Sequence, residues 1–327
     1  MRAVRDLESG GPEVLTVSEA PEPELTADGV LIGVTAAGLN RADVLQRQGH
    51  YAVPPEASDV FGLEVSGTVL EIGDEVPDSA GLSVGDPVVA LVDSGGYAER
   101  VVAPWRQVLP LPDGVDPVAA AGLPEVAATV FSNVFMAASA REGETLLVHG
   151  GAGGIGTHAI QVARALGLTV LATVGSDEKA RVVTELGATA INYRDEDFVA
   201  RVHELTDGRG ADVILDVVGA AYLDPNLRAV ATNGRIVVIG MQGGAKGELN
   251  VGRLLAKRAA VIGTTLRARP AEEKARIMAA VREHVWPLVA SGAVRPLVSR
   301  TFPLDEVRAA HEYFDAGSHT GKVLLTL

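Results

Sequence analysis

The stretch VHGGAGGIG, residues 148–156, decides the fold of this chain of 327 residues. It places Gly-x-Gly-x-x-Gly at Gly151, Gly153 and Gly156, between a β-branched run and a helical pattern. In that context the first glycine permits a tight turn, the second lets a diphosphate approach the backbone, and the third lets helix and strand pack closely. The start of a helix also offers free N–H groups and a partial positive charge to phosphates. The stretch therefore predicts a dinucleotide-binding site.

Strand and helix patterns alternate from this glycine loop onward. Apolar residues with helical spacing follow it over 155–166, and β-branched runs then alternate with further helical patterns. The expected strands are 145–149, 169–173, 190–192, 213–216, 235–239 and 260–263, and the expected helices are 177–186, 199–205 and 223–230. This alternation predicts an α/β fold with a doubly wound parallel sheet, the Rossmann arrangement.

The two ends of the chain have a different texture. Short β-branched runs at 30–34, 67–72 and 87–92, separated by Gly, Pro and Asp, predict a β-rich, barrel-like N-terminal part. After residue 265, two helical patterns (271–290 and 304–314) and a strand (322–327) form a tail too short for a domain of its own. We expect this tail to pack on the N-terminal part. The predicted domains are a catalytic domain of residues 1–122 and 266–327 and a cofactor domain of residues 123–265.

Composition excludes several classes of protein. The chain has no cysteine, which removes disulfides, cysteine nucleophiles and thiolate zinc sites. Its net charge of −14 argues against nucleic acid and anionic membranes as partners. Residues 1–11 have no apolar core, so we expect no signal peptide. The apolar stretch 117–140 is interrupted by Pro124-Glu125, which favours a buried helix over a membrane span. The prediction is a soluble, cytoplasmic protein.

The choice between NADH and NADPH depends on the end of the second strand of the parallel sheet, about 20 residues after the glycine loop. NAD enzymes usually carry an acid there, whereas this chain has Gly175, followed by Ser176 and Lys179. The missing carboxylate removes repulsion toward a 2′-phosphate, and Ser176, Lys179 and Tyr193 supply donors to it. NADPH is therefore expected; the alternative for Lys179 is an ordinary solvated lysine. The expected contacts from the residues alone are Gly151, Gly153, Gly154, Ile155, Gly156, Gly175, Ser176, Lys179 and Tyr193.

Three other chemistries lack their signatures. None of the five tyrosines has a lysine four residues later, which excludes the short-chain dehydrogenase mechanism. A Gly-x-Ser-x-Gly at 81–85 is followed by a turn into a strand, not by the helix that a hydrolase nucleophile needs. The seven histidines show no ligand spacing, so no catalytic metal is expected.

Two N-terminal segments, GLNRADVLQRQGHY (38–51) and GLEVSGTV (62–69), resemble the medium-chain dehydrogenase/reductase superfamily. Within it they resemble the zinc-independent quinone oxidoreductases, the zeta-crystallin-like family. The resemblance continues through residues 123–125, the glycine loop and 191–193 to Gly-Lys-Val at 321–323, and so covers the whole chain. Zinc alcohol dehydrogenases of the superfamily carry Cys where Asn40 stands and His where Leu63 stands. The resemblance thus implies a GroES-like catalytic domain without a metal.

The same resemblance implies reduction of quinones by hydride (or electron) transfer from NADPH. It places Asn40, Tyr51 and Thr129 near the nicotinamide and the substrate. It also implies that Gly240, Met241, Thr265 and Leu266 lie in segments that close on the nicotinamide. Tyr51 is expected to donate a hydrogen bond or a proton to the reduced oxygen, or only to shape the site. The amide of Asn40 contacts the reactants or merely holds its loop.

Two other functions stay open. One is an enone or enoyl-thioester double-bond reductase on the same scaffold, since the hydride transfer is the same. The other is an NADPH-binding protein with an RNA-binding side role, against which the net charge of −14 argues. The last strand of the parallel sheet would leave an edge that can pair with its copy, so a homodimer is expected.

Overall fold

The computed structural model describes residues 1–51, 53–54 and 57–327, which form two compact units. Unit 1 comprises residues 1–128, 267–291 and 295–327, and unit 2 comprises residues 129–266 and 292–294. The divisions fall at 128/129 and 266/267, where the sequence predicted 122/123 and 265/266. Each unit has its own sheet and its own apolar core.

Unit 2 is built on a six-stranded sheet in the order β10-β9-β8-β11-β12-β13, with every neighbouring pair parallel. The strands are β8 (Thr145–Val148), β9 (Thr169–Val174), β10 (Thr189–Asn192), β11 (Ala211–Asp216), β12 (Val230–Val238) and β13 (Ala260–Gly263). The chain thus starts in the middle at β8, runs outward to β10, and returns to β11 on the other side of β8. This is the doubly wound order, and it confirms the predicted fold class.

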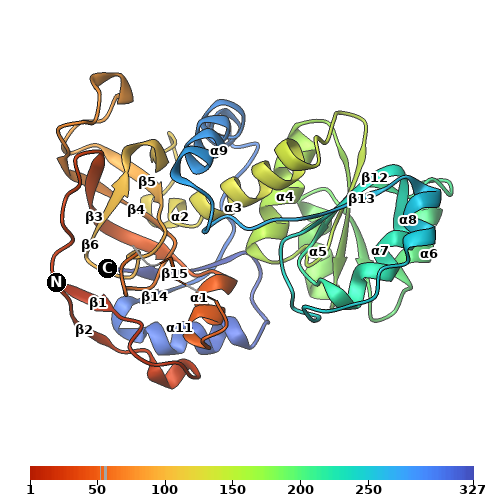
Figure 1. Ribbon diagram of the computed structural model, residues 1–327, viewed down its shortest axis with the longest axis horizontal. Helices are drawn as coiled ribbons and strands as arrows, with labels where there is room; N and C mark the ends of the chain where they lie inside the picture. Colours follow the sequence, from red (N-terminus) through yellow and green to blue (C-terminus); the bar gives the residue numbers. More distant parts are fainter. Residues whose placement is uncertain (52, 55–56) are drawn as a thin grey trace. The chain divides into compact units, whose positions relative to one another are not determined.

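Helices cover both faces of this sheet (Figure 1). They are α4 (Gly154–Ala165), α5 (Asp177–Glu185), α6 (Phe198–Leu205), α7 (Leu223–Ala229) and α8 (Val251–Lys257). Successive residues of each strand point to opposite faces, so Leu146 and Val148 pack with α4 and α5 in one core cluster. Leu147 packs with α6 and α7 in another. The side chains of Leu146, Leu147 and Val148 are fully buried, as expected for a strand covered on both faces.

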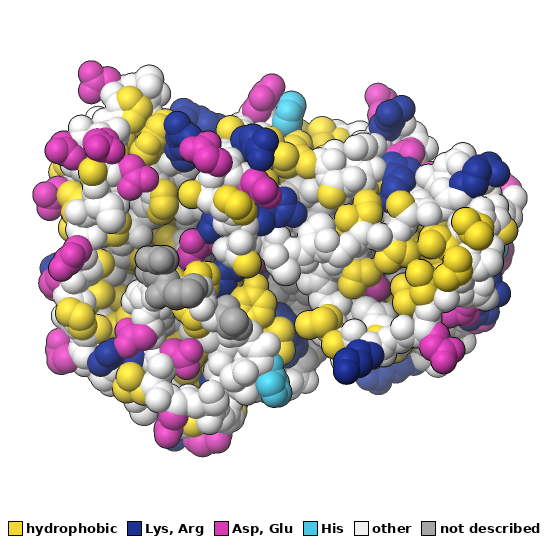
Figure 2. Space-filling view, in the orientation of Figure 1, with side chains coloured by type: hydrophobic (Ala, Val, Ile, Leu, Met, Phe, Trp, Pro, Cys, Tyr) yellow, Lys and Arg dark blue, Asp and Glu magenta, His cyan; other side chains and the backbone are white. Residues whose placement is uncertain are grey.

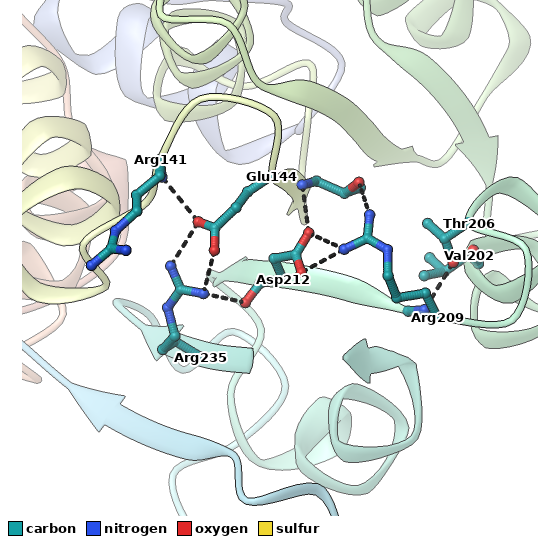
Figure 3. A network of polar contacts seen from close by, with 9 residues as sticks. Arg141, Glu144, Val202, Thr206, Arg209, Asp212 and Arg235 are labelled. Carbon is teal, nitrogen blue, oxygen red and sulfur yellow. Dashed lines mark hydrogen bonds and ion pairs between the residues drawn. The ribbon is translucent and has the colours of Figure 1, made fainter. Parts of the chain in front are cut away.

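A network of charged side chains joins β8, β11 and β12 near the beginning of β8 (Figure 3). The guanidinium of Arg235 donates to both carboxylate oxygens of Glu144, at 2.9 and 2.8 Å. Asp212 accepts from the N–H of Thr145 at 2.8 Å and from Arg209 at 2.6 Å. The hydrogen bonds to Arg235 hold the pKa of the Glu144 carboxyl below its usual value. The network lies at the opposite end of β8 from the glycine loop, so we interpret it as structural.

Unit 1 is built on a seven-stranded mixed sheet in the order β14-β15-β3-β4-β5-β7, with β6 also paired to β3. Its strands are β3 (Gly29–Gly38), β4 (Glu64–Ile72), β5 (Pro87–Leu91), β6 (Arg100–Pro104), β7 (Val108–Pro110), β14 (Val298–Pro303) and β15 (Lys322–Thr326). Among the pairs of described strands in this sheet, β14 and β15 are parallel and the others are antiparallel. Because β15 pairs with β3, the C-terminal tail completes the N-terminal sheet, as the sequence predicted.

Short elements complete unit 1. The strands β1 (Arg2–Val4) and β2 (Val17–Glu19) pair antiparallel. The helices are α1 (Arg41–Arg47), α2 (Pro117–Ala120), α9 (Ala271–His284), α10 (Trp286–Ala290) and α11 (Val307–Asp315), and α3 (Pro124–Val130) crosses into unit 2. Single 3₁₀ turns occur at Pro12–Val14, Asp78–Ala80, Trp105–Gln107 and Leu304–Glu306, and unit 2 has one at Ala220–Tyr222.

Two predicted helices differ from the structure. The pattern over 271–290 is divided into α9 and α10, because Pro287 has no N–H to continue the helix. The pattern over 304–314 begins as a 3₁₀ turn before α11. The apolar stretch Pro117–Ala137 is long and apolar enough to cross a membrane, but 78% of its most apolar window is buried within the protein. It is therefore core helix, as its interruption at Pro124 indicated.

Candidate cofactor and substrate site

The glycine loop joins the end of β8 to the start of α4. Gly150 adopts a φ of +70°, which favours glycine, and turns the chain away from the strand. The N–H of Gly151 donates to the carbonyl of Thr173 in β9 at 2.9 Å, so the loop is fastened to the neighbouring strand. Gly153 is the N-cap of α4, and Gly154 and Ile155 form its first turn. The first N–H groups of a helix lack partners inside the helix, so this turn presents donors and a partial positive charge.

The three motif glycines are required for different reasons. A Cβ on Gly156 would lie 2.5 Å from the carbonyl oxygens of both Gly150 and Gly151, so α4 packs directly on the loop backbone. A Cβ on Gly151 would lie 2.7 Å from the Cβ of Ala172 in β9. A Cβ on Gly153 would meet only the carbonyl oxygen of Gly150, at 3.5 Å. The fold itself therefore needs glycine at 151 and 156 but not at 153.

Four predicted residues come together where β9 and β10 end. Ser176 caps α5 and accepts a hydrogen bond from the N–H of Lys179 at 3.3 Å. Tyr193 follows β10, is 45% exposed, and lies so close to Gly175 that a Cβ there would be 2.5 Å from its hydroxyl oxygen. The acid Asp177 accepts from the side chain of Asn192 at 3.3 Å. Gly175 thus leaves room for the hydroxyl of Tyr193 where an NAD enzyme has its acid.

Arg194 is a cation that the sequence interpretation missed. Burial lowers the pKa of Lys179, and the nearby positive charge of Arg194 lowers it further, so the two cations share one region. Arg194 follows Tyr193, directly after β10. A cation in the first turn of α5 and another just after β10 make this edge of the sheet suitable for an anionic group.

His149 holds together the strand ends that carry the glycine loop. Its pKa is lowered by burial from 6.5 to about 4, so the ring is neutral near pH 7. Asp216 accepts from the amide nitrogen of Asn226 at 3.0 Å, which turns the amide oxygen of Asn226 toward His149 Nε2 at 2.7 Å. Nε2 therefore carries the proton, and Nδ1 accepts from the hydroxyl of Thr173 at 3.0 Å. The series of hydrogen bonds from Thr173 to Asp216 links β9 and β11 through His149, the residue after β8.

Thr129 and Thr265 lie in segments joined by Asn133. After α3 the chain winds as a π-helix, Phe131–Ala137. The amide nitrogen of Asn133 donates to the carbonyl of Thr129 at 2.7 Å, and its oxygen accepts from the hydroxyl of Thr264. Thr264 and Thr265 follow β13, and Leu266 is the last residue of this part of unit 2. π-Helical turns occur frequently at functional sites, and this one brings two of the predicted segments together.

The loop with Gly240 and Met241 is fastened to the end of β11 by backbone contacts. A Cβ on Gly240 would lie 2.6 Å from the carbonyl oxygen of Val217. The N–H of Gly243 donates to the carbonyl of Val218 at 2.7 Å. Met241, at the tip, is 60% exposed. Close packing on the chain itself accounts for Gly240, while Met241 stays available to a ligand.

In unit 1, the amide of Asn40 is held by a buried ion pair. Its nitrogen donates to Glu64 Oε1 at 3.0 Å, and its oxygen accepts from Lys322 Nζ at 2.7 Å. Lys322 Nζ in turn lies 2.6 Å from Glu64 Oε1, with both side chains almost completely buried. These contacts favour the second of the two roles considered for Asn40, an amide that holds its loop.

The side chains around Asn40 do not suit a metal ion. The resemblance described above places metal ligands at the positions of Asn40 and Leu63, but the Asn40 oxygen accepts from the ammonium of Lys322 and Leu63 has no ligand atom. In the described part of the chain, no group of three or more His, Cys, Asp or Glu side chains is arranged to hold a metal ion.

Tyr51 is half-buried above a guanidinium that sequence analysis missed. Arg267 is 5% exposed, and its Cζ lies 5.7 Å from the centroid of the Tyr51 ring. Burial raises the pKa of Tyr51, so its hydroxyl keeps its proton near neutral pH. Asp43 lies fully buried nearby and accepts from the hydroxyl of Tyr97 at 3.1 Å. Burial raises the pKa of Asp43 from 3.8 to about 6.

Comparisons with known proteins agree with this organisation. Residues 26–113 match the alcohol dehydrogenase GroES-like domain, and residues 154–282 match the zinc-binding dehydrogenase family. The human quinone oxidoreductase is 34% identical over 333 residues, covering 100% of this chain and 98% of its own. A crystal structure of the Escherichia coli quinone oxidoreductase complexed with NADPH covers both chains fully, with a TM-score of 0.88 and 28% identity. A structure titled as an NAD-dependent alcohol dehydrogenase also covers both chains fully, with a TM-score of 0.87 and 30% identity.

Proposed function

Because the chain belongs to the quinone oxidoreductase family of the medium-chain dehydrogenase/reductase superfamily, we propose that it reduces quinones with NADPH and without a metal. The observation that carries the proposal is the space above Gly153. This position tolerates a side chain as far as the fold is concerned, and its φ of −74° suits any residue. A glycine there keeps the start of α4 open to a closely approaching diphosphate.

The 2′-phosphate is the natural anion for the region around Gly175. Lys179 and Arg194 supply positive charge there, and the hydroxyls of Ser176 and Tyr193 supply hydrogen bonds. The nearest acid after β9, Asp177, is engaged by Asn192. Two cations, Lys179 and Arg194, in one region attract a 2′-phosphate more strongly than an uncharged ribose hydroxyl, which supports NADPH over NADH.

NADPH, when bound, supplies the hydride from its nicotinamide C4. The hydride brings two electrons to the quinone, and one further proton is needed to complete the hydroquinone. Tyr51 holds a proton at neutral pH and is our candidate to deliver it to the reduced oxygen. Thr129, Thr265, Leu266 and Met241 are proposed to position the nicotinamide. Quinones accept hydride without a Lewis acid, which fits a site where the oxygen of Asn40 already accepts from the ammonium of Lys322.

A single substitution separates ligand binding from folding. In Gly153→Ala the new methyl group lies in ordinary contact with the chain, so we expect unchanged thermal unfolding but NADPH binding weakened about tenfold or more, roughly 1.4 kcal/mol or above. The matched control is Gly252→Ala in α8, where the nearest atom would lie at 3.6 Å, compared with 3.5 Å at Gly153. Calorimetric titration measures the NADPH affinity of both variants. Full NADPH affinity in Gly153→Ala would remove the principal support for the proposal.

The substrate class is tested by steady-state NADPH oxidation with simple quinones, α,β-unsaturated ketones and aldehydes, with a chelator present. Turnover with quinones well above that with enones is expected. The reverse ranking would favour the double-bond reductase. Activity that requires added zinc would refute a metal-free reaction. In the same assay Tyr51→Phe tests the hydroxyl alone, and unchanged turnover and affinity would limit Tyr51 to shaping the site.

We also propose a cytoplasmic homodimer acting on small molecules. β13 forms an edge of its sheet, with β12 as its partner among the described strands. Hydrophobic side chains gather over this part of unit 2 in Figure 2. Exposed large hydrophobic residues there include Leu249, Val251, Leu255 and Val261. A free edge beside apolar side chains is a template for pairing with a second copy. Tight RNA binding at physiological salt would contradict the expectation of no nucleic-acid partner.

A further inference from the structure

Among the residues that the structure describes, no carboxylate is hydrogen-bonded or ion-paired to the buried guanidinium of Arg267. Its Nε donates to the carbonyl of Asp93 at 2.5 Å and its Nη1 donates to the amide oxygen of Gln46 at 2.7 Å, both uncharged acceptors. Its Nη2 is buried and has no partner among the described residues. Buried guanidinium groups are normally paired with acids, because an unpaired charge is costly to remove from water. Such an exception needs a reason.

The carboxylate of Asp93, the residue whose carbonyl accepts from Arg267, is already paired with another cation. Both carboxylate oxygens of Asp93 accept from Lys274 Nζ, at 2.5 and 2.6 Å, and the same ammonium donates to the carbonyl of Arg267 at 3.2 Å. Gln46, whose oxygen holds Arg267, donates its amide nitrogen to Asp6 at 3.0 Å. These contacts hold the guanidinium in place through uncharged acceptors.

The fixed charge faces the ring of Tyr51, with 5.7 Å from Arg267 Cζ to the ring centroid. Several groups act on the hydroxyl of Tyr51. Burial and the negative charges of Glu125, Asp43 and Asp93 raise its pKa, and Arg267 opposes them. Asp43, Asp93 and Asp6 are in turn the acids that act on Arg267. Among these groups, only Arg267 stabilises the phenolate.

We infer that Arg267 is a positioning residue that enables Tyr51 to release its proton to the reduced substrate oxygen. This inference rests on the proposed quinone reduction. Hydride addition leaves the quinone as a hydroquinone monoanion. The O–H bond of Tyr51 breaks, an O–H bond forms on the hydroquinone, and Tyr51 is left as a phenolate until solvent returns a proton. The guanidinium stabilises that phenolate through its charge, which in a buried site is screened far less than in water.

The test is the ionisation of Tyr51 in the enzyme without cofactor or substrate, so it does not depend on the substrate class. Near-ultraviolet phenolate absorbance is titrated in each variant and in the same variant with Tyr51→Phe, and the difference isolates Tyr51 from the other four tyrosines. Arg267→Met should raise the pKa of Tyr51, whereas Arg267→Lys should leave it nearer the wild-type value. Gln46→Met is the matched control, because it removes a hydrogen bond to Arg267 but keeps the charge.

The kinetic counterpart is a fall in kcat with quinone of roughly tenfold in Arg267→Met, as expected for weakened general-acid catalysis. NADPH affinity, measured by titration, should stay unchanged. If Arg267→Met does not fold, Arg267→Gln provides the neutral variant with an amide donor for the Asp93 carbonyl. An unchanged or lowered pKa of Tyr51 in a folded neutral variant would overturn the inference. If the wild-type protein does not turn over quinones, the proposed function is refuted instead.

Discussion

Breaking the buried ion pair between Glu64 and Lys322 on one side should strongly destabilise unit 1. Lys322 Nζ lies 2.6 Å from Glu64 Oε1, and the side chains are 5% and 0% exposed. The ammonium also donates to the carbonyl of Leu39 at 2.9 Å and to Asn40 Oδ1 at 2.7 Å. Glu64 Oε2 accepts from the N–H of Glu125 at 2.9 Å. Lys322→Met removes the ammonium while keeping much of the side-chain length, so the carboxylate stays buried without a cation.

The expected loss of unfolding free energy is about 4 kcal/mol. Removing one partner of a buried ion pair costs about 3–5 kcal/mol, because the remaining charge is left in a medium of low polarity. The N–H groups of Asn40 and Glu125 still contact Glu64 and reduce this cost. The carbonyl of Leu39 and the amide oxygen of Asn40 each lose a donor, which adds roughly 1 kcal/mol apiece. In the double variant Glu64→Gln with Lys322→Met, neither side chain carries a charge. It should lose only about 1–2 kcal/mol of unfolding free energy.

Urea unfolding followed by tryptophan fluorescence measures this change in the right part of the molecule. The chain has two tryptophans, Trp105 and Trp286, and both lie in unit 1. Glu64→Gln alone supplies the fourth corner of a double-mutant cycle. A loss below about 1 kcal/mol in Lys322→Met would refute the reasoning. So would a double variant no more stable than the single one, since neutralising both partners should relieve the uncompensated charge.

Three further predictions concern other parts of the protein. Lys179→Ala should weaken NADPH binding by about 1.5–3 kcal/mol and NADH binding much less, measured by titration calorimetry, and equal losses would count against a 2′-phosphate contact. Folded Asp43 keeps its proton up to about pH 6, whereas the unfolded chain ionises it near 3.8, so stability falls as pH rises through this window. Asp43→Asn should remove up to about 3 kcal/mol of that fall, and parallel pH–stability curves would contradict it. Val261→Lys, on the exposed edge strand, should convert dimers to monomers in light scattering, and an unchanged mass would exclude this edge as the interface.

The sheet of unit 2 was predictable because local patterns and the fold agree there. The expected strands at 145–149 and 260–263 match β8 and β13 to within one residue. The prediction for β12 began at 235, whereas the strand begins at Val230. Residues 231–234, Ala-Thr-Asn-Gly, have the composition of a turn, and Asn233 does adopt a positive φ of 62°. Pairing with β11, which carries an irregularity between Ala211 and Val213, keeps this segment in the sheet.

The polar contacts of the site were less accessible to sequence analysis because they join distant segments. Arg267 and Gln46 are separated by 221 residues, and Asn133 and Thr264 by 131. Periodicity reports which face of an element is apolar, but not which element a polar side chain will meet. His149 was set aside because it showed no ligand spacing, although the sequence placed it as the last residue of the expected strand 145–149. A polar residue at the end of a central parallel strand is the signal that could have found it.

The contacts around Asn40 support the proposed reaction without a metal. The place of a metal ligand is taken by an amide whose oxygen receives an ammonium at 2.7 Å, so the positive charge of the site is provided by Lys322. That charge is committed to Glu64 at 2.6 Å and cannot move toward a substrate oxygen. An alcohol or an isolated carbonyl needs a strong electrophile beside its oxygen, and this pair does not supply one. A conjugated quinone needs only a hydride donor and a proton, and the proton can come from Tyr51. We therefore propose that the fixed pairing of Lys322 with Glu64 limits the protein to acceptors that are already electron-poor.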